Sequence, residues 1–118
     1  PGPDKIHNSM FKHLTEAHLE TILQLFNYIW TKKVFPTAWR RSYVIPIPNP
    51  GKDTKNPANY RPIALTSCLC KLLERIINNR LVHVLESRNI LSRGQSGFRK
   101  CYSTIDNILI LETEIREA

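Results

Sequence analysis

The cations of this sequence are its first candidates for chemistry, because most of the surplus positive charge lies in one region. The formal net charge is +7, and residues 31–61 carry +6 of it. This region holds one acidic residue, Asp53, and seven basic ones: Lys32, Lys33, Arg40, Arg41, Lys52, Lys55 and Arg61. Five of the eight prolines also fall between Pro46 and Pro62, so the chain is stiff and irregular there. A basic, proline-stiffened loop suits an anionic partner such as nucleic acid, whereas Lys32 and Lys33 alone fit a solvated face.

The acidic residues argue against a self-contained catalytic centre. The only three aspartates, Asp4, Asp53 and Asp106, lie far apart in the sequence. Metal-dependent phosphoryl transfer needs clustered carboxylates, so we expect neither catalytic residues nor a metal-ligand set in this chain. Asp106 closes the segment Ser103-Thr-Ile-Asp106, which has the spacing of a capping box, and we assign it to capping a helix.

The cysteine pattern favours a reduced protein. Cys68, Cys70 and Cys101 are an odd number, and their spacing from the four histidines matches no usual zinc site. The sequence has no signal-like stretch and no apolar run long enough to span a membrane. These features together predict an intracellular protein.

The first half of the chain is predicted to form a helix and a hairpin. Apolar residues recur at helical spacing from His13 to about Trp30, with Thr15 as candidate cap and Pro36 as the latest end. We interpret this stripe as core: Leu19, Ile22, Leu23, Phe26, Ile29 and Trp30. Residues 42–48 and 60–65 have the composition of two strands, joined by a turn-rich loop with a cationic tip.

Two further helices are predicted in the second half. One runs from residue 66 or 67 to about residue 88, with a wide apolar face: Leu69, Leu72, Leu73, Ile76, Ile77, Leu81, Val84 and Leu85. The other begins at Ser103, with its own apolar side: Ile105, Ile108, Leu109, Leu111 and Ile115. The loop between them, residues 92–102, contains two glycines and three cations but no acid. A chain of 118 residues is therefore predicted to be one small α+β domain, with three helices and a β-hairpin.

Four motifs in a fixed order carry a resemblance that no single one would carry. Pro-Gly-Pro-Asp at 1–4 comes before Val-Ile-Pro-Ile-Pro-Asn-Pro-Gly-Lys-Asp at 44–53 and Tyr-Arg-Pro-Ile-Ala-Leu-Thr-Ser-Cys-Leu-Cys-Lys-Leu-Leu-Glu-Arg at 60–75. Gln-Ser-Gly-Phe-Arg at 95–99 and Ser-Thr-Ile-Asp at 103–106 follow. In this order, essentially the whole chain resembles the amino-terminal part of the reverse transcriptase domain of non-LTR retrotransposons, the jockey-like long interspersed elements in particular.

This resemblance implies part of a right-hand polymerase. Residues 1–40 would be an N-terminal helical segment, and residues 41–118 the fingers and the entry to the palm. The family's catalytic aspartates lie in two palm motifs that are absent here, and the chain ends at Ala118, about where the first would begin. We therefore expect a fragment that is inactive alone, from an enzyme whose Mg²⁺ ligands lie outside this chain.

The resemblance also implies a nucleotide-binding arginine. A nucleoside triphosphate carries about four negative charges, and the planar fork of an arginine can bind two phosphate oxygens at once. Arg61 lies where the family has such an arginine, and its structural alternative is to hold the base of the hairpin. Asn49 replaces a lysine that the family commonly has, so Lys52 or Lys55 is the next candidate, with no basis for a choice between them.

A second candidate region is the loop that the family places near the template. Within it we assign Gln95, Gly97, Phe98 and Arg99 to template binding: Gly97 would allow close approach, Phe98 would pack under a base, and Arg99 would hold a phosphate. The alternative is a tight turn with a buried Phe98.

The sequence therefore predicts a fragment of an RNA-directed DNA polymerase, located in nucleus and cytoplasm. Its expected partners are an RNA template, a DNA primer, deoxynucleoside triphosphates, and the palm, thumb and endonuclease parts of the polymerase, with no membrane. The alternative function is a non-catalytic, basic nucleic-acid-binding or interaction module from a decayed element. Departures from the family pattern at Lys5, Asn49, and Cys101 with Tyr102 keep a degenerate, inactive copy open.

Overall fold

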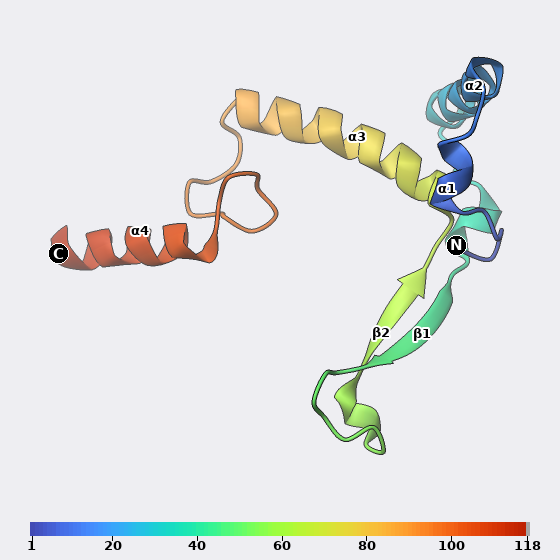
Figure 1. Ribbon diagram of the computed structural model, residues 1–118. Helices are drawn as coiled ribbons and strands as arrows, with labels where there is room; N and C mark the ends of the chain where they lie inside the picture. The colour runs from blue at the N-terminus through green and yellow to red at the C-terminus, as the bar shows by residue number, and fades with distance from the viewer. Residues whose placement is uncertain (118) are drawn as a thin grey trace. The chain divides into compact units, whose positions relative to one another are not determined.

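The computed structural model describes residues 1–117, which form four α-helices, two short 3-10 helices and one two-stranded sheet (Figure 1). The elements in order are α1 (Asn8–Phe11), α2 (Glu16–Lys32), η1 (Thr37–Arg40), β1 (Tyr43–Pro48), η2 (Pro57–Asn59), β2 (Tyr60–Leu65), α3 (Cys68–Ser87) and α4 (Thr104–Glu117). The chain divides into two compact units, residues 1–77 and residues 78–117. The mixed helix and strand composition is as predicted, with α1 as the additional helix.

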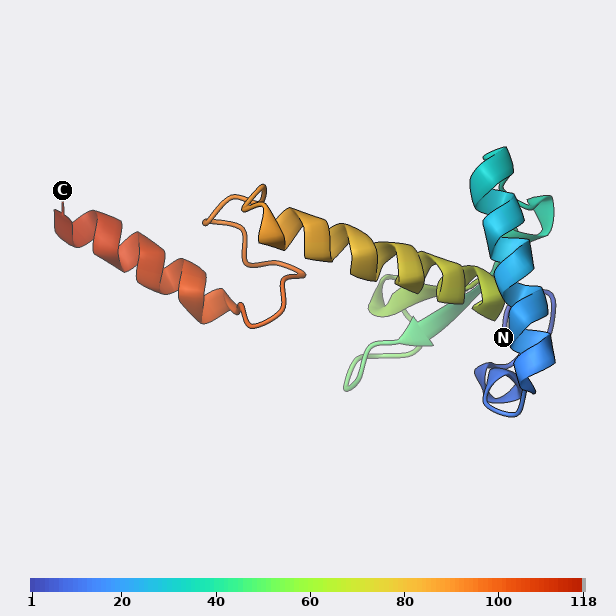
Figure 2. The same ribbon diagram turned by 90° about the horizontal axis from the view of Figure 1, so that it is seen from above.

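The first unit has one small hydrophobic core, which forms where α2 meets the first turns of α3 (Figure 2). Its buried members are Phe26, Ile29, Trp39, Cys70 and Leu73. Partly buried side chains pack around them: Ile22, Leu69, Leu72 and Ile77. Trp39 comes from the 3-10 turn η1, and its ring meets Phe35 edge to face with the centroids 5.8 Å apart. The core therefore joins three elements through a narrow patch.

Thr15 lies at the predicted N-cap position of α2, although its side chain makes no capping hydrogen bond, and the helix ends close to Trp30 and before Pro36, as predicted. Thr15 is its N-cap residue, and its hydroxyl lies 2.6 Å from His18 Nδ1. The helix ends at Lys32, because Lys33 adopts a left-handed conformation with φ 53°. The end therefore comes before Pro36, from a local C-cap and not from the proline.

The prediction that the whole apolar stripe of α2 is core is wrong. Phe26 and Ile29 are buried, whereas Leu19, Leu23 and Trp30 are exposed. The apolar face predicted for α3 is exposed in part, at Ile76, Leu81 and Val84. The apolar side predicted for α4 is exposed at all five of its residues: Ile105, Ile108, Leu109, Leu111 and Ile115. The physical reason is that each apolar face is wider than the surface that covers it within its own unit.

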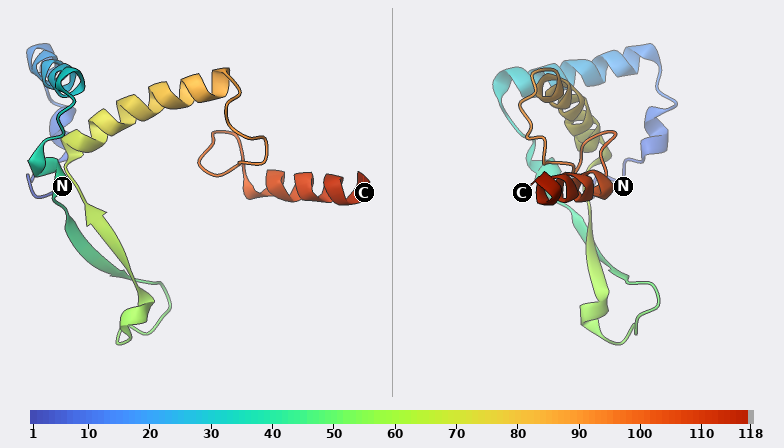
Figure 3. Two further views of the ribbon diagram at one scale, coloured as in Figure 1. Left: turned by 180° about the vertical axis from the view of Figure 1, so that it is seen from behind. Right: turned by 90° about the vertical axis from the view of Figure 1, so that its left-hand side faces the viewer.

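The hairpin is confirmed in position and direction. Strands β1 and β2 pair antiparallel, from Tyr43 opposite Leu65 to Pro48 opposite Tyr60 (Figure 3). Pro46 lies opposite Pro62, so neither residue can donate to the ladder at that pair. These are the only two strands in the described part of the chain.

The first residues of the chain lie against the start of α3. Gly2 is buried, and a Cβ atom built on it would lie 2.5 Å from the carbonyl carbon of Thr66. Ser67 is buried and caps α3, because its hydroxyl oxygen accepts a hydrogen bond of 3.4 Å from the Cys70 N–H. Hydrogen bonding by the same hydroxyl lowers the pKa of the Asp4 carboxyl. The Pro-Gly-Pro-Asp motif therefore fixes the junction between β2 and α3.

Within residues 1–117, no helix is both long enough and apolar enough to cross a membrane.

Candidate nucleic-acid interface

Arg61 lies on β2 with its side chain exposed. It pairs with Ile47 of β1, and the alternation along a strand places it on the same face as Ile63 and Leu65. The two ion pairs among residues 1–117 join Arg99 to Glu86 and Arg116 to Glu112, so Arg61 has no carboxylate partner in the described part of the chain. The guanidinium is therefore open to an external anion, and no ion pair supports the alternative in which it holds the hairpin base.

The hairpin tip presents Lys52 and Lys55 on an ordered loop. Both side chains are exposed. Four hydrogen bonds organise the backbone beneath them: Asn49 N–H to Asn59 O (2.8 Å), Asn59 Nδ2 to Asp53 O (2.9 Å), Tyr60 Oη to Thr54 O (2.8 Å) and Lys55 N–H to Asp53 Oδ1 (3.0 Å). Gly51 makes the turn at φ 74°, which favours glycine. The single acid of the tip, Asp53, is thus engaged with the backbone of its own loop.

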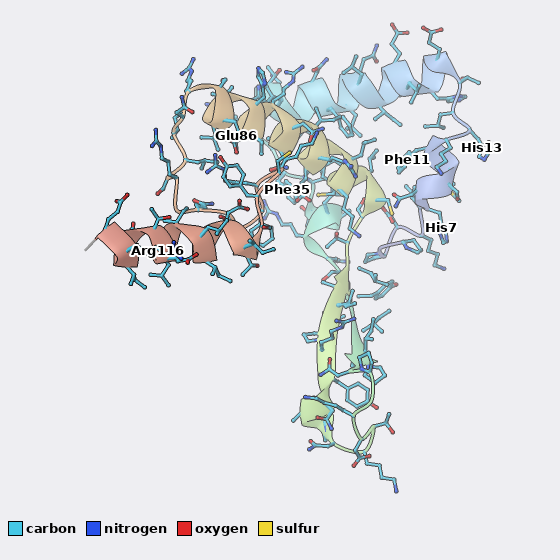
Figure 4. All side chains as sticks on the ribbon, turned by 60° about the vertical axis from the view of Figure 1, so that its left-hand side comes forward. His7, Phe11, His13, Phe35, Glu86 and Arg116 are labelled. Atoms are coloured by element: carbon cyan, nitrogen blue, oxygen red, sulfur yellow. The ribbon has the colours of Figure 1, made fainter. Side chains whose placement is uncertain are left out.

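Arg99 organises the second candidate region, the loop between α3 and α4. Its Nε and Nη2 donate to the two carboxylate oxygens of Glu86 at 2.8 and 2.7 Å, and Glu86 is labelled on α3 in Figure 4. Its Nη1 donates to the carbonyl oxygens of Ser92 and Gln95, at 3.0 and 3.1 Å. The ring of Tyr102 stacks on the guanidinium, whose carbon lies 4.2 Å from the ring centroid. Four of the five N–H groups of Arg99 are therefore used within the loop and the end of α3.

The electrostatics of this pair follow from its geometry. The Arg99 side chain is only 10% exposed, and the Glu86 side chain is 36% exposed. The hydrogen bonds from Arg99 lower the pKa of the Glu86 carboxyl, and the same bonds raise the pKa of Arg99. Both groups are therefore charged at neutral pH. The direct phosphate contact of Arg99 stays a prediction, and one N–H of the guanidinium is left to make it.

Phe98 is the most exposed large apolar side chain of this loop. Its relative accessible area is 110%, and its φ is 61°, a conformation that aromatic residues seldom adopt. The alternative of a buried Phe98 is wrong for the described chain. Next to it, a Cβ built on Gly97 would meet no atom within 4 Å, and Gln95 is exposed. Nothing in the described chain requires a glycine at 97, which leaves room for a ligand there.

Two further contacts hold the start of α4. The Ser96 hydroxyl is buried and donates to Asn107 Oδ1 at 2.6 Å. The Asp106 carboxylate accepts from the N–H and the hydroxyl of Ser103, which lowers the pKa of Asp106. The capping prediction for Asp106 is confirmed, and its side chain is fully explained by that role.

The described residues do not fit a divalent-metal site. Among residues 1–117, no three side chains of His, Cys, Asp or Glu type lie close enough together to hold a metal ion. The Cys70 thiol donates to Glu74 Oε1 at 3.6 Å. Burial and the Glu74 carboxylate raise the pKa of Cys70 to about 11.

The profile of the family described as reverse transcriptase (RNA-dependent DNA polymerase) matches residues 47–118, more than half of the chain. The chain belongs to the reverse transcriptase family. Its match includes β2, α3, the Arg99 loop and α4, so both candidate regions lie largely within it.

The relatives of this reverse transcriptase chain come from non-LTR retrotransposons. It is 36% identical, over its whole length, to the probable RNA-directed DNA polymerase from transposon BS of Drosophila melanogaster, of which it covers 13%. It is 35% identical over 92% of its length to the probable RNA-directed DNA polymerase from transposon X-element of the same species, and covers 12% of that protein. It is 39% identical over 68% of its length to the retrovirus-related Pol polyprotein from type-1 retrotransposable element R2 of Popillia japonica, of which it covers 10%. The chain thus spans about an eighth of the length of the first two relatives.

Sequence reasoning missed the partners that build this reverse transcriptase segment. Glu86 holds Arg99 in place, Asn107 holds Ser96, and the backbone of Ser67 lies against Gly2 of the Pro-Gly-Pro-Asp motif. The only available signal for Glu86 was that an arginine in an acid-free loop needs an acid from a neighbouring element. The contacts of Ser67 and Asn107 depend on three-dimensional proximity, for which the sequence carries no periodic signal.

Proposed function

We propose that this chain forms the fingers and the entry to the palm of a non-LTR retrotransposon reverse transcriptase, where it binds nucleotide and template. The observation that carries the proposal is an exposed Arg61 without an ion-pair partner among residues 1–117, on a hairpin with Lys52 and Lys55 at its tip, within the segment that matches the family. The metal and the reacting atoms belong to another part of the polymerase. This chain then contributes binding and orientation, not the chemical step.

The nucleotide side of the proposal rests on charge and exposure. Arg61 would bind two oxygens of the triphosphate with its fork, since no carboxylate within residues 1–117 competes for it. Lys52 and Lys55 would add single contacts from the tip, where the ordered backbone limits the entropy lost on binding. These contacts would hold the substrate before it reaches the metal.

The template side rests on the Gln95–Arg99 loop. Phe98 offers an exposed ring for stacking on a base, Gly97 leaves open space beside it, and Gln95 adds an exposed amide. Arg99 is assigned to the same contact, through its remaining N–H. The expected partners are single-stranded RNA template, DNA primer, deoxynucleoside triphosphates and the palm, thumb and endonuclease parts.

Steady-state kinetics of the polymerase that carries this segment test the nucleotide contact. Arg61→Ala is expected to raise KM for deoxynucleotide about tenfold or more, with little change in template affinity, because a charge-assisted bidentate contact is lost. Arg61→Lys should recover only part of the loss, since an ammonium has no fork. Arg75→Ala removes an equally charged, exposed arginine from α3 and is the matched control. Unchanged nucleotide kinetics in Arg61→Ala would overturn the assignment.

The second candidate function is a non-catalytic, basic nucleic-acid-binding module. The +6 charge of residues 31–61 favours it, since this charge needs no polymerase around it to attract a polyanion. For such a module, the binding constant for single-stranded RNA should fall with salt at a log–log slope of about 0.7 per phosphate contact. If the chain is instead part of a polymerase, the isolated chain should bind RNA weakly, and tight binding of template should require the whole enzyme.

A further inference from the structure

The contacts of Arg99 connect both ends of the loop that carries Phe98. Glu86 lies in the last turn of α3, Ser92 and Gln95 lie before Phe98, and Tyr102 lies just before α4. One guanidinium therefore ties together four points of the chain across residues 86–102. Its side chain is 10% exposed, as expected for a group that orders a loop from inside.

A phosphate ligand would show a different arrangement. The charged fork of Arg99 already faces a carboxylate, with both bidentate bonds shorter than 3 Å. A template phosphate bound by the fork would have to displace Glu86, because the bonds to Glu86 and to two backbone carbonyls leave a single N–H of Arg99 free. Arg93 and Lys100 are exposed in the same loop and are better placed for phosphate.

We propose that the Glu86–Arg99 pair is a positioning device, which holds the Gln95–Phe98 turn so that the Phe98 ring is presented to a template base. The inference rests on the template-binding role proposed above, and it moves Arg99 from direct contact to support. Phe98 keeps a left-handed φ of 61° without any burial of its ring in the described chain. Such strain persists only where surrounding contacts hold it, and the contacts of Arg99 to Gln95 and Ser92 provide them.

The residues around Phe98 favour a nucleic-acid base, rather than an apolar protein surface, as the partner of its ring. Between residues 92 and 102 there are three cations and no acid, and Arg93 and Lys100 are exposed beside the ring. An exposed aromatic ring among exposed cations is the combination that binds single-stranded nucleic acid, by stacking plus backbone attraction. An apolar protein partner would have to desolvate those cations.

In the polymerase that carries this segment, the two roles of Arg99 predict opposite effects of Glu86→Ala on the affinity for RNA. If Arg99 binds phosphate directly, removal of Glu86 frees it and removes a negative charge, so the affinity for a single-stranded RNA oligonucleotide rises. If the pair positions Phe98, affinity falls toward that of Phe98→Ala, for which the expected loss is about tenfold. Glu112→Ala is the matched control, because it removes the same charge from the exposed Glu112–Arg116 pair of α4. An affinity in Glu86→Ala that equals or exceeds that of Glu112→Ala overturns the proposal.

Two further measurements, the RNA affinity of Arg99→Lys and amide hydrogen exchange, distinguish the positioning of Phe98 by Arg99 from a general loss of structure. Lysine keeps the charge but not the fork, so a positioning role predicts a loss as large as in Arg99→Ala, whereas a phosphate contact would be largely kept. Amide exchange in residues 92–102 should rise in Glu86→Ala and Arg99→Lys but not in Phe98→Ala, with the thermal midpoint of the polymerase little changed. Unchanged exchange in Glu86→Ala contradicts the proposal.

Substitutions of Phe98 test the proposed function independently. Phe98→Tyr should keep template affinity and Phe98→Leu should lose it, because a base stacks on a ring. If Phe98→Leu keeps affinity while Phe98→Ala loses it, the ring packs on protein, and the template assignment and the positioning proposal both fail. If only the Phe98 variants weaken binding while Glu86→Ala does not, the template contact stands and the positioning role alone is overturned.

Discussion

Gly2 lies so close to Thr66 that the chain leaves no room for a side chain there. A Cβ on Gly2 would lie 2.5 Å from the Thr66 carbonyl carbon and 2.6 Å from the Ser67 nitrogen, both backbone atoms that cannot swing away. The contact joins the first residues of the chain to the junction between β2 and α3. It places Gly2 of the Pro-Gly-Pro-Asp motif just past the end of β2, the strand that carries Arg61.

Gly2→Ala should therefore destabilise the first unit. Forcing a methyl group against backbone requires the N-terminal segment or the start of α3 to move, at a cost of about 1–3 kcal/mol. Urea unfolding of the chain, followed by circular dichroism, measures this difference. Gly97→Ala is the matched control, because a Cβ there meets nothing within 4 Å, and its stability should change little. Equal stability of the two variants would mean that the segment is not docked as described.

Asp4 adds a pH dependence to the same junction. Hydrogen bonding by the Ser67 hydroxyl lowers the pKa of Asp4 below its usual 3.8 in the folded chain. Its contribution is therefore present above the unfolded value and is lost as the pH falls through the lowered folded value. Between pH 5 and pH 2, the free energy of unfolding should fall more steeply for the natural chain than for Asp4→Asn. Parallel curves for the two proteins would contradict the hydrogen bond.

Much of the secondary structure could be predicted from local patterns. The strands at 43–48 and 60–65 followed from β-branched residues bounded by turn residues, and Asp106 followed from capping-box spacing. Burial was predicted less well, since helical periodicity shows that a face is apolar but not whether a partner covers it. For that reason Leu23 and Trp30 were expected in the core and are exposed, while Trp39, in a short 3-10 turn without periodicity, is buried.

For the candidate sites too, the positions of the residues could be predicted from the sequence, but their contacts could not. Arg61, Lys52 and Lys55 were chosen from the resemblance to the reverse transcriptases of non-LTR retrotransposons, and all three side chains are exposed. The engagement of Arg99 could not be predicted, because Glu86 lies 13 residues away on another element. The charge pattern and the family resemblance therefore located the loops, whereas the contacts within them required the three-dimensional structure.

The two tryptophans should report their different surroundings. Trp39 is 9% exposed and Trp30 is 67% exposed. Trp30→Phe leaves only Trp39, and its fluorescence should lie at shorter wavelength and be quenched less by acrylamide than that of Trp39→Phe. In stability, Trp39→Ala should cost about 3–5 kcal/mol, while Trp30→Ala should stay within about 0.5 kcal/mol. Similar emission from both single-tryptophan variants would contradict the burial of Trp39 in the core.

The three cysteines should differ sharply in reactivity. Cys101 is exposed, while Cys68 and Cys70 are buried, and burial together with Glu74 raises the pKa of the Cys70 thiol to about 11. Because the thiolate is the reacting form, a thiol reagent such as dithionitrobenzoate at pH 8 should modify one cysteine in the native chain and all three after denaturation. Mass spectrometry should locate the native modification at Cys101, and Cys101→Ser should abolish it. Rapid native labelling of Cys70 would show that the start of α3 opens from the core, since Cys70 packs there with Phe26 and Leu73.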